Sequence, residues 1–329
     1  MRHWVSMIDW DAGELLGLVS RAAELKAGAT TDALRGRILG MLFFNPSLRT
    51  RVSMEAAMMR FGGHAITLSP GADSWRIEYA DGVRMDGDRA EHVREAARVL
   101  SRYCDVLGVR SFADMKDYSE DRRETVIRSL AQFATVPVVN LESATEHPCQ
   151  ALGDMLTMRE KLGATEGRKF VLTWAPHVNP LPLAVPHSAV LAASLSGMDV
   201  TIAHPEGYEL DDEILRHANS IHVTHDQTEA LRAADIVYVK SWGARAMYGD
   251  IERQRDSFHR HASWTVSLDK LSPSSYLMHC LPVRRNLVIS DDALDSERSI
   301  VVDQAENRMW AQAAILEHLL LEGRSWYDE

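Results

Sequence analysis

The stretch Phe44-Asn45-Pro46-Ser47-Leu48-Arg49-Thr50-Arg51 is the most informative part of this chain. It follows an apolar run over residues 38–44 that is typical of a buried strand, and it precedes a helical pattern over residues 52–61. Ser47 fits the position that caps a helix, where the first N–H groups have no partner within the helix. Because the helix dipole also favours negative charge there, the turn predicts a site for a phosphate or similar oxyanion. Taken alone, it is equally consistent with an ordinary capped helix carrying solvated arginines.

Composition narrows the class of protein. With 329 residues the chain exceeds one typical domain, and its 46% hydrophobic and 25% charged residues are those of a globular protein. The net charge of −11 argues against nucleic acid or an anionic membrane as the main partner. The three cysteines form no CxxC pair or His/Cys cluster, so no metal site is predicted. No signal-peptide core or bilayer-spanning run is evident, so we expect a reducing cytoplasm.

Strand and helix patterns alternate along the chain, which predicts an α/β fold of two doubly wound parallel-sheet domains. A boundary is expected near residues 143–150. No GxGxxG motif follows a strand, so a dinucleotide site is unsupported. The predicted strands cover residues 38–44, 64–68, 105–109, 137–141, 169–174, 199–203, 221–224, 235–239 and 276–279.

Polar side chains recur where these strands end, which is where ligands bind in such folds. Each has a plain explanation alone, such as a solvated arginine or a small buried cysteine. Together they offer cations, histidines and amides suited to binding a phosphate and polarising an adjoining carbonyl. The residues are Arg110, Glu142, His147 to Gln150, His177, Lys240, His279 to Pro282, Arg284, Arg285 and Arg308.

Three motifs in this order resemble the aspartate/ornithine carbamoyltransferase family: Phe44-x-Pro-Ser-x-Arg-Thr-Arg, His147-Pro148-x-Gln150 and His279-Cys280-Leu281-Pro282. The resemblance covers nearly the whole chain. It implies a carbamoyl-phosphate-binding domain over residues 1–143 plus 306–329, with a C-terminal helix returning to it, and an acylornithine-binding domain over residues 144–305. It also implies a homotrimer with active sites shared between subunits, and no metal or organic cofactor.

The chain departs from ordinary ornithine carbamoyltransferases at Lys240-Ser241-Trp242, where those enzymes carry groups that grip a free α-amine. A lysine there would repel an ammonium but could pair with a substrate carboxylate. This pattern resembles the N-acetylornithine and N-succinylornithine carbamoyltransferases of arginine biosynthesis, as do Trp75, Met85-Asp86-Gly87-Asp88 and Glu306-Asn307-Arg308.

Two positions bear on the acyl group. The acetyl-specific enzymes carry Glu two residues after the Met-Asp-Gly-Asp run, and the succinyl-specific ones carry Pro, whereas this chain has Ala90. Ala90 leaves room and places no carboxylate beside a succinyl tail. The acetyl enzymes also carry a lysine where this chain has Val288. We therefore favour N-succinylornithine as substrate, with N-acetylornithine as the alternative.

The resemblance further implies the role of each side chain. Trp75 would come from the neighbouring subunit, and Cys280 and Leu281 would act through backbone carbonyls. Carbamoyl phosphate would be bound by Ser47, Leu48, Arg49, Thr50, Trp75, Arg110, His147, Pro148, Cys149, Gln150, Cys280, Leu281 and Arg308. The catalytic set would be Arg49, Thr50, Arg110, His147, Gln150 and Cys280. The acylornithine would be bound by Glu142, His177, Lys240, Leu281 and Arg284.

Attack on the carbamoyl carbon needs a neutral δ-amine, so activity is expected to rise with pH above neutral. No side chain stands out as general base, and the leaving phosphate is a candidate for the proton. Two other classes remain open: a non-catalytic paralogue that binds carbamoyl phosphate, and a Rossmann-type oxidoreductase. A diamine substrate is disfavoured because Lys240 and Arg284 would repel a dication.

Overall fold

The computed structural model describes residues 1–322, which fall into two compact units. The first unit contains Met1–Ala113, Arg123–Cys149 and the chain from Arg308 onward. The second contains Asp114–Arg122 and Gln150–Asn307. Residues 323–329 of the predicted first domain lie outside the described residues.

These units differ from the predicted domain boundaries at two main places. Residues 144–149 lie in the first unit, because the turn there is bonded to strand β6 (Val138–Glu142): the Cys149 thiol donates to the Asn140 carbonyl at 3.3 Å. Residues 114–122 lie in the second unit, because the Tyr118 hydroxyl donates to Asp211 at 2.5 Å. Both differences arise from tertiary hydrogen bonds that the local sequence pattern does not contain.

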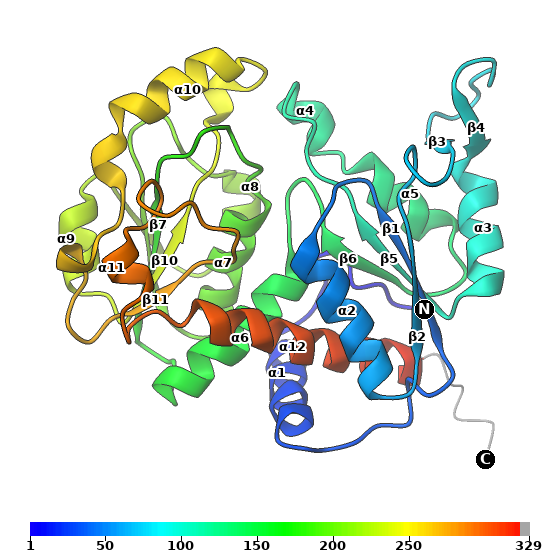
Figure 1. The fold of residues 1–329 in the computed structure, drawn as a ribbon, viewed down its shortest axis with the longest axis horizontal. Coiled ribbons are helices and arrows are strands. Elements are labelled where there is room, and N and C mark those ends of the chain that lie inside the picture. The colour runs from blue at the N-terminus through cyan, green and yellow to red at the C-terminus, as the bar shows by residue number, and fades with distance from the viewer. Residues whose placement is uncertain (323–329) are drawn as a thin grey trace. The chain divides into compact units, whose positions relative to one another are not determined.

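The first unit is built on a parallel sheet in the order β2-β1-β5-β6. Figure 1 shows α3 and α5 on one side of this sheet and α1, α2 and α12 on the other. An apolar core fills the space between the sheet and the α3–α5 layer. The strands are β1 Ile38–Phe43, β2 His64–Leu68, β5 Val106–Arg110 and β6 Val138–Glu142, with a small second sheet of β3 Arg76–Glu78 and β4 Arg89–His92. The helices are η1 Met7–Asp9, α1 Ala12–Lys26, α2 Leu48–Arg60, α3 Val93–Tyr103, α5 Thr125–Phe133 and, from Arg308 on, α12 Val301–Glu322.

The second unit repeats the plan with a parallel sheet in the order β11-β10-β7-β8-β9. Helices α7 and α9 cover opposite faces of this sheet (Figure 1). The strands are β7 Lys169–Trp174, β8 Asp199–Ala203, β9 Ile221–Thr224, β10 Ile236–Lys240 and β11 Tyr276–Met278. The helices are α4 Tyr118–Asp121, α6 Pro148–Leu162, α7 Ala184–Leu195, α8 Asp212–Leu215, α9 Gln227–Arg232, α10 Ile251–Arg260 and α11 Asp291–Leu294, with 3-10 turns η2 Arg245–Met247, η3 Ala262–Trp264 and η4 Leu268–Lys270.

The strand order reverses once in each unit, and this reversal positions the candidate site. In the first unit the chain moves from β1 outward to β2 and then back to β5, so the switch lies between β1 and β5. In the second unit the switch lies between β7 and β10. Ligands of open α/β sheets bind at the carboxyl ends of strands flanking such a switch. The predicted α/β fold with parallel sheets is thus confirmed. The candidate site is expected in the segments that follow β1, β5, β7 and β10.

No helix within residues 1–322 combines the length and apolar character that crossing a membrane requires.

Candidate functional site

The turn between β1 and α2 carries the predicted oxyanion-binding residues. Ser47 caps α2, and its Oγ accepts a hydrogen bond from the Thr50 N–H at 3.2 Å. Asn45 ties this turn to the end of β5, because its Oδ1 accepts a hydrogen bond from the Phe112 N–H at 2.7 Å. The N-terminus of α2 is therefore fixed beside the residues that follow β5. Leu48, Arg49 and Thr50 are its first three residues.

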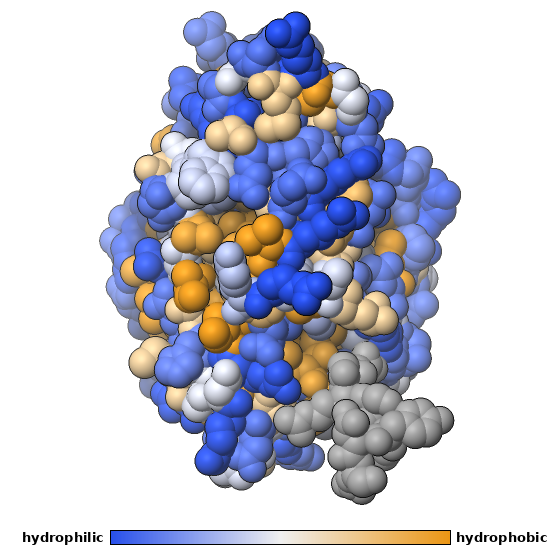
Figure 2. All heavy atoms as spheres, turned by 90° about the vertical axis from the view of Figure 1, so that its right-hand side faces the viewer, coloured by the Kyte–Doolittle hydropathy of each residue, from blue (hydrophilic) through white to orange (hydrophobic). Residues whose placement is uncertain are grey.

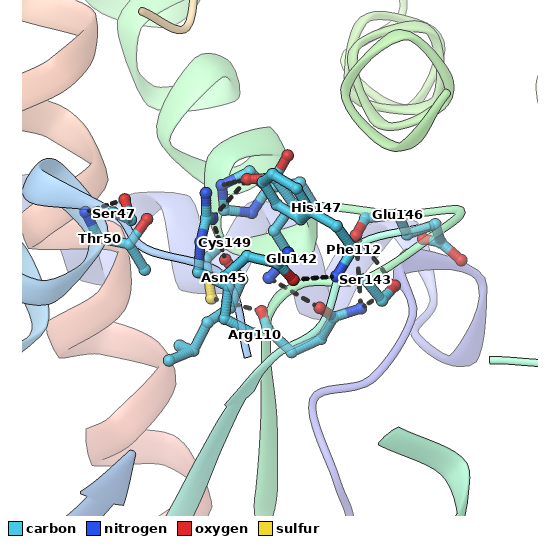
Figure 3. Close-up of polar contacts among 12 residues, drawn as sticks. Asn45, Ser47, Thr50, Arg110, Phe112, Glu142, Ser143, Glu146, His147 and Cys149 are labelled. Carbon is cyan, nitrogen blue, oxygen red and sulfur yellow. Dashed lines mark hydrogen bonds and ion pairs between the residues drawn. The ribbon is translucent and has the colours of Figure 1, made fainter. Parts of the chain in front are cut away.

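Arg110, Glu142 and His147 form a polar cluster in the first unit (Figure 3). Arg110 Nη1 lies 2.5 Å from Glu142 Oε2, and His147 Nε2 lies 3.5 Å from the same oxygen. Arg110 and His147 are buried, with 6% and 2% of their surfaces exposed. The guanidinium also stacks over the Phe112 ring, with Cζ at 4.3 Å from the centroid. Nitrogen atoms of an arginine and a histidine thus lie around one carboxylate at the sheet edge.

Neighbouring strands bring this cluster together. Arg110 ends β5 and Glu142 ends β6, and the two residues are paired across the ladder after a register shift at Val109/Arg110. Glu142 has a φ of 145°, a backbone conformation that non-glycine residues rarely adopt. Asn140 supports it, because its Oδ1 accepts the Glu142 N–H at 2.9 Å. A strained residue held in place by surrounding bonds is typical of a functional position.

The segment that leads into α6 places the His-Pro-Cys-Gln motif. Pro148 begins α6, where its missing N–H is of no consequence. Cys149 is fully buried, and burial raises the pKa of its thiol to about 12. The Arg308 guanidinium opposes that shift, so α12 brings Arg308 near the motif. A thiol of this kind is not a nucleophile at neutral pH.

Gln150, the last residue of the motif, belongs to a buried chain of hydrogen bonds in the second unit. Its Nε2 donates to Asp154 Oδ1 at 2.8 Å, and Gln304 Nε2 donates to the same oxygen at 2.7 Å. Gln304 Oε1 in turn accepts the His279 N–H at 2.9 Å. The two predicted motifs, His-Pro-Cys-Gln and His-Cys-Leu-Pro, are therefore linked through Asp154 and Gln304.

The His-Cys-Leu-Pro motif forms a tight turn after β11. The Leu281 N–H donates to His279 Nδ1 at 2.9 Å, the Leu281-Pro282 peptide bond is cis, and Leu281 has a φ of 56°. His279 is buried, whereas Cys280 and Leu281 are partly exposed. Cys280 is a free cysteine, and the backbone role given to Cys280 and Leu281 stays a prediction.

A second polar group lies at the β7/β10 switch of the second unit. Arg284 Nε donates to His177 Nε2 at 3.1 Å, and His177 Nδ1 lies 2.9 Å from the Asn179 carbonyl. Burial lowers the pKa of His177, and the charges of Lys240 and Arg284 lower that pKa further. Lys240 ends β10 in register with Trp174, the last residue of β7. Two cations and a neutral imidazole thus share one edge of this sheet.

Trp75 and Ala90 lie on or beside the small β3–β4 sheet. Both side chains are exposed, Trp75 by 60%. Trp75 Nε1 donates to Glu91 Oε2 at 2.6 Å. An exposed tryptophan held by a carboxylate on its own sheet is available to a ligand or a second chain.

The structure therefore gathers the predicted residues into separate groups within each unit. Ser47 to Thr50, Arg110, Glu142, His147, Cys149 and Arg308 belong to the first unit, and Gln150, His177, Lys240, Cys280, Leu281 and Arg284 to the second. Sequence reasoning missed Asn45, Asp154 and Gln304. Only Asp154 had a local signal, since it stands one helical turn after Gln150 on the same face. Within residues 1–322, no group of three or more His, Cys, Asp or Glu side chains is arranged to hold a metal ion.

Two families of domains match the chain. Residues 2–160 match the aspartate/ornithine carbamoyltransferase, carbamoyl-P binding domain, and residues 183–319 match the aspartate/ornithine carbamoyltransferase, Asp/Orn binding domain.

Individual relatives span nearly the full length. The chain is 40% identical to an N-acetylornithine carbamoyltransferase of Xanthomonas campestris, covering 98% of this chain and 99% of the relative. It is 38% identical to an N-succinylornithine carbamoyltransferase of Bacteroides thetaiotaomicron, covering 94% and 96%. Its fold superposes with a TM-score of 0.94 on a mutant N-acetyl-L-ornithine transcarbamylase complexed with carbamyl phosphate and N-succinyl-L-norvaline, at 41% identity over 97% of this chain and 100% of that one.

Proposed function

The chain belongs to the aspartate/ornithine carbamoyltransferase family, and from this premise we propose that it carbamoylates the δ-amine of N-succinyl-L-ornithine. The products would be N-succinyl-L-citrulline and phosphate. The relatives support N-acylornithine carbamoyltransferase activity in arginine biosynthesis. The succinyl group is our own more specific assignment. The expected compartment is the cytoplasm.

The first unit supplies the groups for carbamoyl phosphate. The phosphate would bind at the N-terminus of α2, where Ser47, Arg49 and Thr50 offer hydroxyl, guanidinium and N–H donors. Arg110 and His147 would then polarise the carbamoyl carbonyl, since both already converge on one anionic oxygen, that of Glu142. The negative charge that develops on the carbamoyl oxygen would lie close to Arg110 and His147, which would stabilise it.

The cationic set of Lys240, Arg284 and His177 is the observation that carries the acylornithine assignment. Ordinary ornithine has an α-ammonium, which two neighbouring cations would repel. An acylated α-nitrogen is uncharged, so the α-carboxylate can face Lys240 or Arg284 without that penalty. His177 stays neutral in this setting because its pKa is lowered. The second unit therefore favours a substrate with a δ-amine, an α-carboxylate and a neutral amide at the α-nitrogen, which N-acylornithines share.

The chemical step balances without a protein base. The neutral δ-nitrogen attacks the carbamoyl carbon, and the C–O bond to phosphate breaks as the tetrahedral intermediate collapses. The proton lost by the nitrogen leaves with the phosphate. Catalysis then consists of positioning and charge stabilisation.

Ala90 supports succinyl over acetyl. Its side chain carries no charge, and it lies exposed on β4 two residues past the Met85 to Asp88 run. A succinyl carboxylate would be repelled by a glutamate there but not by alanine. N-acetylornithine remains the second candidate, because an N-acetylornithine carbamoyltransferase is 40% identical to this chain.

We also propose that the enzyme is a homotrimer whose subunits share active sites. An apolar hollow of about 130 Å³ opens beside the edge strand β2 and α3 in the first unit. Ile66 and Tyr103, which line it, are 49% and 68% exposed. Figure 2 shows apolar side chains gathered on this side of the first unit. A second copy would cover this surface, and Trp75 is exposed in a way that lets it reach a neighbouring site.

The deciding experiment measures product formation from carbamoyl phosphate with ornithine, N-acetylornithine and N-succinylornithine side by side. Turnover of succinylornithine alone would support the full proposal. Turnover of acetylornithine alone would keep the mechanism and remove the role given to Ala90. Turnover of free ornithine would contradict the role of Lys240, and no turnover of any would favour the non-catalytic paralogue.

A further inference from the structure

Glu146 is a buried acid beside the candidate site to which the proposed reaction assigns no role. It directly precedes His147 and is 5% exposed. Both carboxylate oxygens bind the N-terminal segment of the chain. The Ser6 hydroxyl donates to one, and the Met7 N–H donates to the other at 2.9 Å. A segment far away in sequence is thus fastened to the residue next to His147.

The backbone of Glu146 closes the turn that carries the polar cluster. Its carbonyl accepts the Ser143 N–H at 2.9 Å and lies 3.5 Å from Asn140 Nδ2. Asn140 also holds the Glu142 N–H. Figure 3 shows Ser143 and Glu146 next to Glu142 and His147. Any shift of Glu146 therefore changes the geometry of the Glu142–His147 contact.

A second carboxylate supports the same turn from another element. Glu124 directly precedes α5, and its Oε1 accepts the Thr145 N–H at 2.9 Å and the Thr145 hydroxyl at 2.7 Å. The Ser143 hydroxyl donates to it at 2.5 Å. The turn over residues 143–146 is thus held between Glu124 on one side and Glu146 with the N-terminal segment on the other.

We propose that Glu146 is a positioning residue for His147, acting by fastening the turn over residues 143–146 to Ser6 and Met7. A buried carboxyl group is unfavourable unless hydrogen bonds satisfy it, so this one persists because the N-terminal segment supplies them. The effect on activity rests on the proposed function, whereas the effect on the turn does not.

The two contacts do not require a negative charge. Burial raises the pKa of Glu146 to about 7, although the Ser6 and Met7 hydrogen bonds lower that pKa; the carboxylates of Glu124 and Asp9 raise it as well. A glutamine could keep both contacts, because its oxygen can accept the Met7 N–H while Ser6 Oγ accepts from its amide. Alanine could keep neither. The pair of substitutions therefore separates the contacts from the charge.

The test uses the full-length protein with three variants and a matched control. Glu146→Ala removes both contacts, Ser6→Ala removes one, and Glu146→Gln keeps them. Ser101→Ala is the control: Ser101 lies in the same unit and is 8% exposed like Ser6, but its hydroxyl binds backbone groups away from Glu146, Ala97 O at 2.6 Å and Thr135 N at 3.0 Å. Two readouts are taken, amide hydrogen exchange of residues 143–147 and the separate kcat and KM values.

For Glu146→Ala we expect amides 143–147 to exchange about 10-fold faster. We expect kcat to fall by about 10-fold or more, with KM for acylornithine changed less than about 3-fold, because misplacing one polarising group affects the chemical step. Ser6→Ala should act in the same direction more weakly, and Glu146→Gln and Ser101→Ala should resemble the unaltered protein.

Unchanged exchange in a folded Glu146→Ala protein would overturn the inference, and so would faster exchange with unchanged kcat. If that variant does not fold, Ser6→Ala decides by the same two criteria. If the unaltered protein carbamoylates none of the three substrates, the proposed function fails, yet hydrogen exchange still decides whether Glu146 holds the turn.

Discussion

Arg284 donates its Nε–H to Nε2 of His177 at 3.1 Å, which requires a neutral imidazole. The Asn179 carbonyl and the Asn179 N–H lie 2.9 Å and 3.2 Å from Nδ1. Because Nε2 already accepts from Arg284, we assign the ring proton to Nδ1, which then donates to the carbonyl. Burial, and then the charges of Lys240 and Arg284, lower the pKa of His177 and keep it uncharged. A neutral histidine can thus orient one cation beside another without adding a third positive charge.

This contact predicts weaker substrate binding at acidic pH. Because the folded pKa lies below 6.5, the stabilising arrangement is present above pH 6.5 and is lost as pH falls through the folded pKa. A protonated ring would repel the Arg284 guanidinium and could no longer accept its hydrogen bond. Because Arg284 would then be misplaced, KM for acylornithine should rise several-fold between pH 7 and pH 5. In His177→Asn, whose carbonyl can still accept the hydrogen bond, KM should be nearly flat over that range. An equally steep rise in that variant would contradict the assignment.

Replacing Arg110 tests the polarising cluster. Arg110→Met should lower kcat by about 10²–10³-fold, because it removes a charged donor from the site of developing negative charge. It should also destabilise the protein by about 3 kcal/mol, since Glu142 would lose its buried partner.

A second substitution separates these two effects. The double variant Arg110→Met/Glu142→Gln should regain most of the lost stability, because no buried charge is left unpaired. Chemical unfolding measures this recovery. The transfer activity should stay low. Recovery of kcat in the double variant would show that Arg110 acts only by neutralising Glu142.

The acyl preference offers a third prediction. Ala90→Glu adds a carboxylate to an exposed position on β4 and should lower kcat/KM for N-succinylornithine relative to N-acetylornithine by about 10-fold, corresponding to a charge contact of about 1–2 kcal/mol. Ala90→Gln, which is similar in size but neutral, should change the ratio much less. Equal shifts in both variants would mean that volume, not charge, governs the pocket.

Assembly can be tested at the apolar surface around β2. Ile66→Asp places a charge in a hollow lined by Leu42, Leu68 and Leu107. A partner subunit that covered the hollow would have to desolvate this charge. The molar mass by light scattering should fall from three subunits towards one, and activity should fall with it. Val302→Asp is a control at another highly exposed apolar residue, 74% exposed. A trimer that persists in Ile66→Asp would place the interface elsewhere.

Local patterns predicted the parts of the site that local forces build. Ser47 was identified as a cap because a hydroxyl between an apolar run and a helical stripe satisfies free N–H groups, and the structure shows that bond. The apolar helical pattern begins only at residue 52, whereas α2 begins at Leu48, as a cap at Ser47 implies. The polar residues Arg49, Thr50 and Arg51 break the apolar pattern because this end of the helix lies at the candidate site.

Contacts between side chains that are distant in sequence could not be predicted from local sequence patterns. Glu142 was assigned to acylornithine from the family pattern alone, and that role remains a prediction, but its carboxylate binds Arg110 and lies near His147. That arrangement depends on the register shift between β5 and β6, which no local pattern encodes. Similarly, Gln304 reaches Asp154 from a helix 150 residues away. Strand-end reasoning finds which residues gather at an edge, but not which of them bind each other.

The buried Glu146 predicts an unusual dependence of stability on pH. Its folded pKa of about 7 lies above the ordinary value of 4.5, so the folded protein retains a proton that the unfolded chain loses. The stability this group contributes is complete below pH 4.5 and is lost as pH rises through 7. Because glutamine does not titrate, Glu146→Gln should gain about 2–3 kcal/mol relative to the unaltered protein between pH 5 and pH 8.5. Urea unfolding at both pH values measures this gain, and a pH-independent difference would show that Ser6 and Met7 stabilise the ionised carboxylate as well as the neutral acid.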